Sequence, residues 1–522
     1  MNVLVMFCDQ LRRDLLGCYG GGLVRTPHLD ALAADSVVFD RCYTPIAICS
    51  PARASLMTGQ YPHGHHMYTN STPPYSYCRH LRPDVPMVQQ WARRDAGATT
   101  AYYGKWHIGP VDDLAAAGFD YTHLPPTWPE PSAAAADVAA PLPFLSDTQW
   151  HPLPQWAPLV ASAGPSTGTF ALPMERFPDV VAASHTIDFL RERAAAAEQP
   201  PFLAFCAFPG PHGPWLVPEE FGRRYEAKDI PPWPNRDDSL AGKPLNQRKL
   251  QHMEFSEGGI TYPRLTAAQE AERLTYNFSY IELIDEQVGR VVAELKRSGL
   301  YDDTLLVFTA DHGDMAGSHG FVSKGGYMYD EIYRIPLLIR VPGVASGRRE
   351  REPVTLTDLT ATVAHALVEG AGSDPPPRSL AEGDRAAAEP LHGESLLPAL
   401  RGEGAWERSV AYCEYHGDWY GHYSSRMVAD GDWKLVWNLT DLCELYDLNE
   451  DPHELTNLFY SDASAASDAS GADASGAGSS DLAEVRERYF ELLLAEAART
   501  HDGQLELRQA ELDFDPRRGG IG

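Results

Sequence analysis

The stretch Cys49-Ser50-Pro51-Ala52-Arg53-Ala54-Ser55-Leu56-Met57-Thr58-Gly59 predicts a short helix that starts next to a cysteine. Ser50 can cap the helix by accepting a backbone N–H bond, and the proline that follows suits the first helical position. Good helix formers continue the run, and Gly59 can end it. We therefore expect Cys49 just outside a helix N-terminus, where unpaired N–H groups favour negative charge.

Two residues of this stretch have both a structural and a functional interpretation. Cys49 can be a small buried hydrophobic residue or a reactive thiol of low pKa. Arg53 falls in the first helical turn, where a cation opposes the helix dipole. It is therefore either an ordinary surface arginine or a ligand for an anion. The residues of the stretch alone leave both choices open.

Apolar runs that end in polar residues predict three strands of a parallel sheet buried on both faces. The runs, with the residues that follow them, are Val3–Phe7 with Asp9 and Gln10, Phe202–Phe208 with His212, and Leu305–Thr309 with Asp311 and His312. Ligands of open α/β sheets bind beyond the carboxyl ends of the strands, so Asp9 and Asp311 can converge on one cation. A helix cap is the alternative interpretation of Asp9.

The composition of the chain limits the kinds of protein and of binding partner that are compatible with it. The chain has 522 residues, 43% of them hydrophobic, and a formal net charge of −29. These values predict a large globular protein that binds neither nucleic acid nor an anionic membrane surface. Eight scattered cysteines without a CxxC pair indicate reduced thiols, and residues 2–7 lack the features of a signal peptide. We therefore expect a cytoplasmic location.

Two domains are expected. A catalytic α/β domain spans residues 1–375, and a proline run at 375–377 marks the start of a C-terminal subdomain, 376–522. Short strand patterns near residues 426, 433 and 444 predict a small antiparallel sheet there, and the Ser/Ala/Gly/Asp-rich segment 461–481 predicts a flexible insertion. The tryptophans within 111–170 suggest a homo-oligomer contact.

The motifs together resemble the type I sulfatases of the alkaline phosphatase superfamily. The resemblance is carried, in order, by Asp9-Gln10, T-P-H-L-D-A-L-A at 26–33, the eleven residues 49–59, G-K-W-H at 104–107, and Asp311-His312-Gly313. It implies a large, mostly parallel sheet flanked by helices, followed by a smaller α+β subdomain. It also implies that a maturation enzyme converts Cys49 to formylglycine, whose hydrate is the nucleophile for sulfate ester hydrolysis.

The same resemblance implies roles for individual residues. Residues at five positions would hold one divalent cation, with Ca²⁺ preferred and Mn²⁺ or Mg²⁺ compatible: Asp9, Gln10, modified Cys49, Asp311 and His312. Three cations, Arg53, Lys105 and Lys324, would hold the sulfate group. His107 would act as acid or base, His212 or Lys324 would assist the leaving group, and Asn70 would contact the anion.

A second possible metal site is suggested by the histidines at 63, 65 and 66. They lack the regular helical spacing of zinc ligands, which argues against it.

Departures from the commonest sulfatase pattern keep other functions open. Gln10 and His312 resemble the phosphonate monoester hydrolases and phosphodiesterases of the same superfamily. Those relatives lack the lysine and histidine of G-K-W-H, whose positive charge favours a strongly charged monoester. Sulfatase therefore ranks above phosphonate monoester hydrolase, and a non-catalytic anion-binding protein ranks last. The expected partners are a small sulfated substrate and the maturation enzyme.

Overall fold

The computed structural model describes the chain apart from residues 72–75, 77, 111–113, 115, 124–159, 165–166, 171–172, 223, 253–254, 258–259, 263–264, 345–346, 371–390, 418–421, 462–478 and 506–522. Most of the predicted insertion at 461–481 and the tryptophans proposed for an oligomer contact lie outside the described residues. Within the described part of the chain, no helix is long and apolar enough to cross a membrane.

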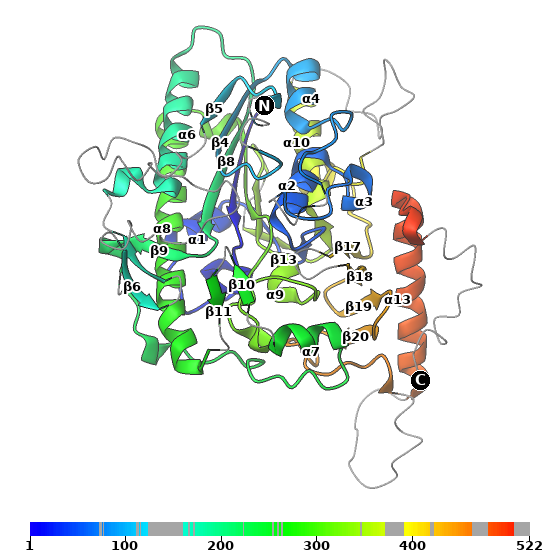
Figure 1. Cartoon of the computed structure of the whole chain (residues 1–522). Coiled ribbons are helices and arrows are strands. Elements are labelled where there is room, and N and C mark those ends of the chain that lie inside the picture. The colour runs from blue at the N-terminus through cyan, green and yellow to red at the C-terminus, as the bar shows by residue number, and fades with distance from the viewer. Residues whose placement is uncertain are drawn as a thin grey trace.

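An eight-stranded sheet forms the centre of the molecule (Figure 1). In spatial order its strands are β15 (Arg348–Glu350), β2 (Val37–Phe39), β14 (Leu337–Arg340), β12 (Thr304–Ala310), β1 (Asn2–Asp9), β8 (Phe202–Pro211), β4 (Thr99–Gly104) and β5 (Tyr121–His123). Only β14 runs against its neighbours within this sheet. The predicted mixed, mostly parallel sheet is confirmed.

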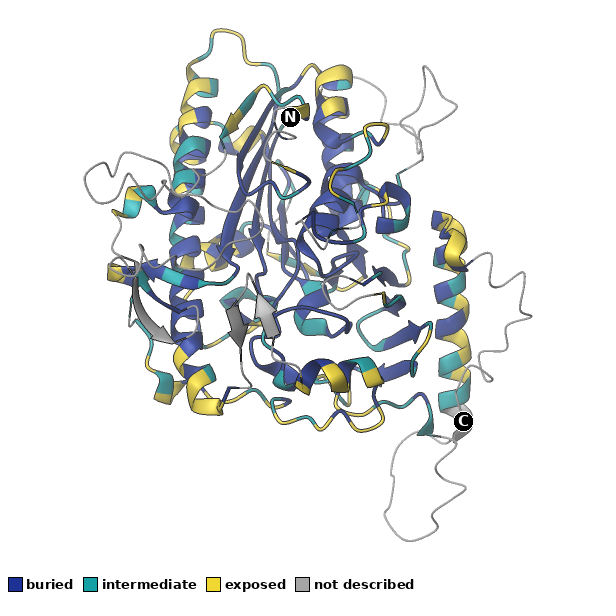
Figure 2. Ribbon diagram, in the orientation of Figure 1, coloured by how far each residue is buried: buried dark blue, intermediate teal, exposed yellow. Residues whose placement is uncertain are grey.

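Helices cover both faces of the sheet, which explains the unbroken apolar runs of its strands. One face carries α1 (Pro27–Ala34), α6 (Pro178–Ala195) and α8 (Ala267–Arg297); the other carries α2 (Cys49–Thr58), α4 (Val88–Ala96) and α10 (Leu356–Gly370) (Figure 1). The central strands and α2 are buried, whereas α6 and α8 expose their outer sides (Figure 2).

The C-terminal part forms its own antiparallel sheet, as predicted. Its strands are β17 (Ala411–Tyr415), β18 (Ser425–Ala429), β19 (Trp433–Asn438) and β20 (Glu444–Asp447), and α13 (Ser479–Thr500) packs against β18 and β19. Sequence analysis missed β17.

The remaining α-helices and strands are β3 (Cys42–Tyr43), α3 (Pro62–His65), β6 (Val160–Gly164), β7 (Thr167–Phe170), β9 (Trp215–Pro218), α7 (Leu245–His252), β10 (Phe255–Glu257), β11 (Ile260–Tyr262), α9 (Asp330–Tyr333), β13 (Arg334–Ile335), β16 (Val354–Thr355) and α11 (Leu397–Arg401).

Gly104, the last residue of β4, is required by the close approach of two strands. Its φ of 109° lies in the left-handed region, and a Cβ there would be 1.9 Å from the carbonyl oxygen of Ala207 on β8. We expect Gly104→Ala to lower the free energy of unfolding by about 2–4 kcal/mol, through backbone strain and steric overlap. Chemical denaturation measures the change, and unaltered stability would contradict the strand contact.

A buried charge cluster joins α3 to the C-terminal part. His63 Nδ1 is bonded to Glu414 Oε1, and its Nε2 lies 2.8 Å from the carbonyl oxygen of Thr500. With acceptors at both ring nitrogens, His63 is held as an imidazolium. The neighbouring histidines do not converge on one point, because His63 faces Glu414 whereas His65 lies 3.0 Å from Ser55 Oγ.

This contact predicts a pH dependence of stability. Burial disfavours the charged imidazolium, but Glu414 outweighs it and raises the pKa of His63 above its ordinary 6.5. The contribution is therefore complete below pH 6.5 and is lost as the pH rises through the folded-state pKa. We expect the stability difference between wild type and His63→Gln to shrink as pH rises from 6 to about 9. Urea unfolding at several pH values measures it, and a constant difference would refute the assignment.

Candidate active site

Four neighbouring parallel strands bring polar residues to one edge of the sheet. In the order β12, β1, β8, β4, these residues are Asp311, Asp9, His212 and Lys105. The register pairs Cys8 with Ala310, so that Asp9 and Asp311 leave their strands side by side. The prediction that acids from two strand ends converge is confirmed, because parallel strands align their carboxyl ends.

The helix that carries the eleven-residue motif points its N-terminus at this edge. Helix α2 begins at Cys49, with Ile48 as its N-cap residue. The prediction that Ser50 caps the helix from its side chain is wrong: the Ser50 N–H instead donates to Asn70 Oδ1 at 3.0 Å. Asn70 therefore supplies the cap from a following loop and fixes the start of the helix beside Cys49. A contact between Asn70 and a bound anion stays a prediction.

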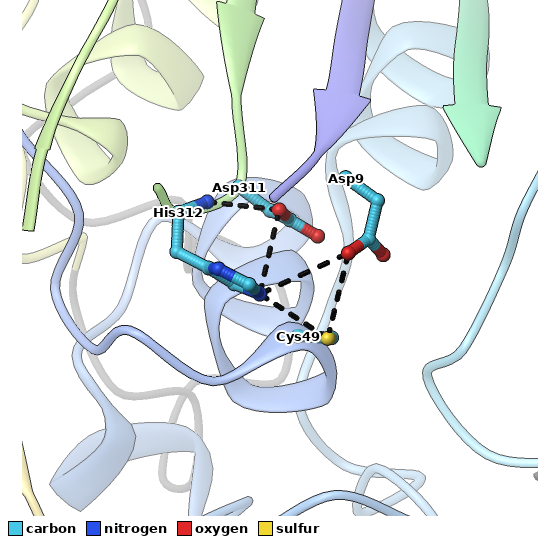
Figure 3. Close-up of side chains that lie close together, drawn as sticks. All are labelled: Asp9, Cys49, Asp311 and His312. Carbon is cyan, nitrogen blue, oxygen red and sulfur yellow. Dashed lines mark hydrogen bonds and ion pairs between the residues drawn. The ribbon is translucent and has the colours of Figure 1, made fainter. Parts of the chain in front are cut away.

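Cys49, Asp9, Asp311 and His312 form a single buried cluster (Figure 3). One ligand atom from each residue lies within 4.8 Å of all the others. The Cys49 Sγ is 3.2 Å from His312 Nε2 and 3.6 Å from Asp9 Oδ1. Two carboxylates, an imidazole nitrogen and the side chain at 49 are thus placed to bind one cation.

His312 presents an unprotonated nitrogen to the cluster. Its Nδ1 lies 2.8 Å from the carbonyl oxygen of Gly313, so Nδ1 carries the hydrogen and Nε2 keeps its lone pair. Burial lowers the pKa of His312, which keeps the ring neutral. The tightness of the turn depends on Gly313, where a Cβ would be 2.0 Å from the Glu331 carbonyl oxygen. The ring is therefore held in the state that metal binding requires.

Arg53 is buried between the two carboxylates and is not the surface arginine that the sequence allowed. Its Nη2 donates to Asp9 Oδ2 at 2.9 Å and its Nε donates to Asp311 Oδ2 at 2.8 Å. Its Nη1 donates to the carbonyl oxygen of Lys105 at 2.6 Å. Burial opposes the charge, but Asp311 and Asp9 raise the pKa of Arg53. The guanidinium thus binds the Oδ2 atoms and leaves the Oδ1 atoms directed to the cluster.

The G-K-W-H motif follows β4 at the same edge. Lys105 Nζ lies 2.6 Å from Asp9 Oδ2, and its side chain is only 4% exposed. Burial acts to raise the pKa of Asp9, but Lys105 and Arg53 outweigh it and keep that pKa well below its ordinary value. His107 is half-buried and has a φ of 58°, an unusual conformation for a residue other than glycine. Its role as acid or base stays a prediction.

Lys324 joins Gln10 to His212. The Lys324 Nζ donates to Gln10 Oε1 at 2.6 Å and lies 3.0 Å from His212 Nε2. Burial, followed by the charge of Lys324, lowers the pKa of His212 well below its ordinary value. The His212 Nδ1 is 2.6 Å from the Gly213 carbonyl oxygen, so the neutral ring accepts from Lys324 through Nε2. The expected metal contact of Gln10 stays a prediction.

Two buried acids that support this edge were missed by sequence analysis. Asp314 accepts from Gln10 Nε2 at 2.7 Å and from the Ala316 N–H at 2.9 Å, although burial raises its pKa. Asp179 accepts from the Gly210 N–H at 3.0 Å and so supports the turn before His212. Asp314 directly follows the Asp311-His312-Gly313 motif, and this position is a signal that could have identified it. The sequence around Asp179 offers no such signal.

Comparisons with known proteins agree with this geometry. The sulfatase family model matches residues 1–369, and the C-terminal model of N-sulphoglucosamine sulphohydrolase matches residues 317–469. An uncharacterized sulfatase, YidJ, of Escherichia coli is 29% identical over 462 residues, which are 88% of this chain and 82% of that protein. A choline-sulfatase of Rhizobium meliloti is 28% identical over 460 residues, with the same coverage.

A solved structure shares the whole architecture. The phosphonate monoester hydrolase of Agrobacterium radiobacter has a TM-score of 0.69 and 26% identity, with 96% of each chain covered. That similarity extends from the large sheet to the C-terminal antiparallel sheet. Since the family model spans more than two thirds of the residues and its motifs meet at one buried site, the chain belongs to the sulfatase family of the alkaline phosphatase superfamily.

Proposed function

We propose that the protein hydrolyses sulfate monoesters to an alcohol and inorganic sulfate. The observation that carries the proposal is the position of Cys49, at a helix N-terminus and within one cluster with Asp9, Asp311 and His312. Negative charge on a substrate is favoured at that helix end. The similarity to proteins named as sulfatases supports a sulfate ester as the substrate.

The residues present fit a divalent cation and a modified Cys49. The carboxylate oxygens of Asp9 and Asp311 suit a hard cation such as Ca²⁺, while His312 Nε2 is compatible with Mn²⁺. When bound, the cation would lower the pKa of a nearby hydroxyl and offset substrate charge. Formylglycine at position 49, formed by a maturation enzyme, would supply the nucleophilic hydroxyl as its hydrate.

The chain's own residues hold the substrate and the leaving group. Lys105 and Lys324 place two ammonium groups at the site, one beside Asp9 and one beside His212, where they would neutralise sulfate oxygens. Because His212 is neutral and accepts from Lys324, we assign stabilisation of the leaving oxygen to Lys324 in this state. Arg53 acts by orienting the two carboxylates.

A phosphonate monoester hydrolase is the second candidate function. The residues Gln10 and His312 and the structural similarity to the Agrobacterium enzyme favour it. The buried Lys105, which belongs to the motif that those relatives lack, favours the sulfatase. Promiscuity between the two activities is compatible with one site.

Matched aryl esters distinguish the two functions. We expect kcat/KM for 4-nitrophenyl sulfate to exceed the values for a 4-nitrophenyl phosphonate monoester and a phosphate diester, with the protein isolated from its native host. The identical leaving group makes the transferred group the only variable. Mass spectrometry of the peptide bearing Cys49 establishes its modification in the same sample. Faster phosphonate hydrolysis would reverse the ranking.

We place the protein in the cytoplasm on the support of its eight free cysteines, which suit a reducing compartment. The proposed partners are a small sulfated substrate and the maturation enzyme, with neither nucleic acid nor membrane bound. Fractionation of the native host tests the location.

A further inference from the structure

Asp314 is a buried carboxylate whose two oxygens each accept an N–H donor. Oδ1 accepts from the backbone of Ala316, and Oδ2 accepts from Gln10 Nε2 at 2.7 Å. The residue is 1% exposed and follows the turn that carries Asp311 and His312. None of the roles described above uses it, yet it bonds a side chain that faces the site.

Asp314 determines which way the Gln10 amide points. The Gln10 Nε2 lies against Asp314, with Ser323 Oγ at 3.3 Å, while Oε1 accepts from Lys324 Nζ. A carboxylate only accepts hydrogen bonds, and an ammonium only donates them. A flipped amide would bring its oxygen against Asp314 and its NH₂ group against Lys324, so both contacts would become repulsive.

The orientation of the Gln10 amide also determines where Lys324 lies, next to His212. Gln10 Oε1 and His212 Nε2 accept from the same Lys324 Nζ, at 2.6 and 3.0 Å. Gln10 is itself held by backbone geometry, with a φ of 62° and its N–H bonded to Asp311 Oδ1 at 3.0 Å. A single chain of bonds thus runs from Asp314 through Gln10 and Lys324 to His212.

We infer that Asp314 is a positioning residue that, through Gln10, fixes the Lys324 ammonium where it offsets the charge developing on the leaving oxygen. The inference rests on the proposed sulfatase function. Its consequence is a dependence on the leaving group: the poorer the leaving group, the more charge collects on its oxygen and the more a correctly placed ammonium contributes.

The test compares Asp314→Asn with wild type on two esters. In this variant one of the two accepting oxygens becomes an NH₂ group, which faces either the Ala316 N–H or Gln10 Nε2. We expect kcat/KM to fall about tenfold for 4-nitrophenyl sulfate and about a hundredfold for phenyl sulfate, the larger loss being at the lower end of the range for groups that assist a leaving atom. Asp314→Ser, which is smaller and uncharged, should show the same steeper dependence and replaces Asp314→Asn if that variant does not fold.

A matched control separates positioning from general destabilisation. Asp238→Asn neutralises a partly buried carboxylate that holds the same loop, by bonds to His319 Nδ1 at 2.7 Å and Lys243 Nζ at 2.6 Å. It should slow both esters by the same factor. An equal loss on both esters for Asp314→Asn, with wild-type turnover intact, would overturn the inference. If wild-type protein with confirmed formylglycine hydrolyses neither ester, the proposed function fails instead.

Discussion

Replacing Cys49 with alanine is expected to lower kcat for 4-nitrophenyl sulfate by about 10⁵-fold or more, the scale seen when a nucleophile is removed. The methyl group of alanine can neither be oxidised to the aldehyde nor attack sulfur. The fold should tolerate the change, because Cys49 is a small residue at the start of α2 and the cap from Asn70 remains. Steady-state kinetics on metal-loaded protein measure the loss.

The matched control for this substitution is Cys443→Ala, which removes another buried free thiol, just before β20 in the connection from β19. It should leave kcat within about twofold of wild type, because the thiol is remote from the cluster. Calcium titration by calorimetry should still detect binding to Cys49→Ala, since Asp9, Asp311 and His312 remain. Residual turnover close to that of wild type would refute the role of Cys49.

Replacing Arg53 with methionine is expected to lower the free energy of unfolding of metal-free protein by about 3–5 kcal/mol, the cost of leaving a buried ion pair without one partner. Two carboxylates, Asp9 and Asp311, would lose their shared guanidinium, and both are fully buried. A bound cation would supply replacement positive charge. Added Ca²⁺ should therefore recover more stability in Arg53→Met than in wild type.

The comparison needs a second buried ion pair, and Arg408 with Asp358 offers one at 2.7 Å. Arg408→Met should also lower the free energy of unfolding, but Ca²⁺ should not restore the loss, because this pair is not part of the cluster. Guanidinium denaturation with and without Ca²⁺ measures all three proteins. Equal calcium responses in the two variants would show that Arg53 does not act on the metal carboxylates.

Several elements could be predicted because their signals are local. Burial leaves a direct trace in the sequence of such elements. Strands buried on both faces appear as unbroken apolar runs in β1, β8 and β12, and a helix with one buried face appears as an amphipathic pattern in α8. The apolar run at 335–342 has the pattern of a single strand, but Pro336 divides it between β13 and β14, which belong to different sheets. Strand pairing is a long-range choice, and a short apolar run carries no record of its partner.

The sequence by itself determined the residue types of the site and their order, because strand ends and helix starts have local signatures. It also placed Asp9 and Asp311 at the carboxyl ends of two predicted strands, where they could converge, but the pairing of β1 with β12 that brings them together is tertiary. Only the tertiary structure decided that Asn70 caps α2, that Arg53 binds two carboxylates, and that Asp314 orients Gln10. These hydrogen bonds join residues 20 to 304 positions apart, and the direction of a polar side chain depends on partners that only folding brings near.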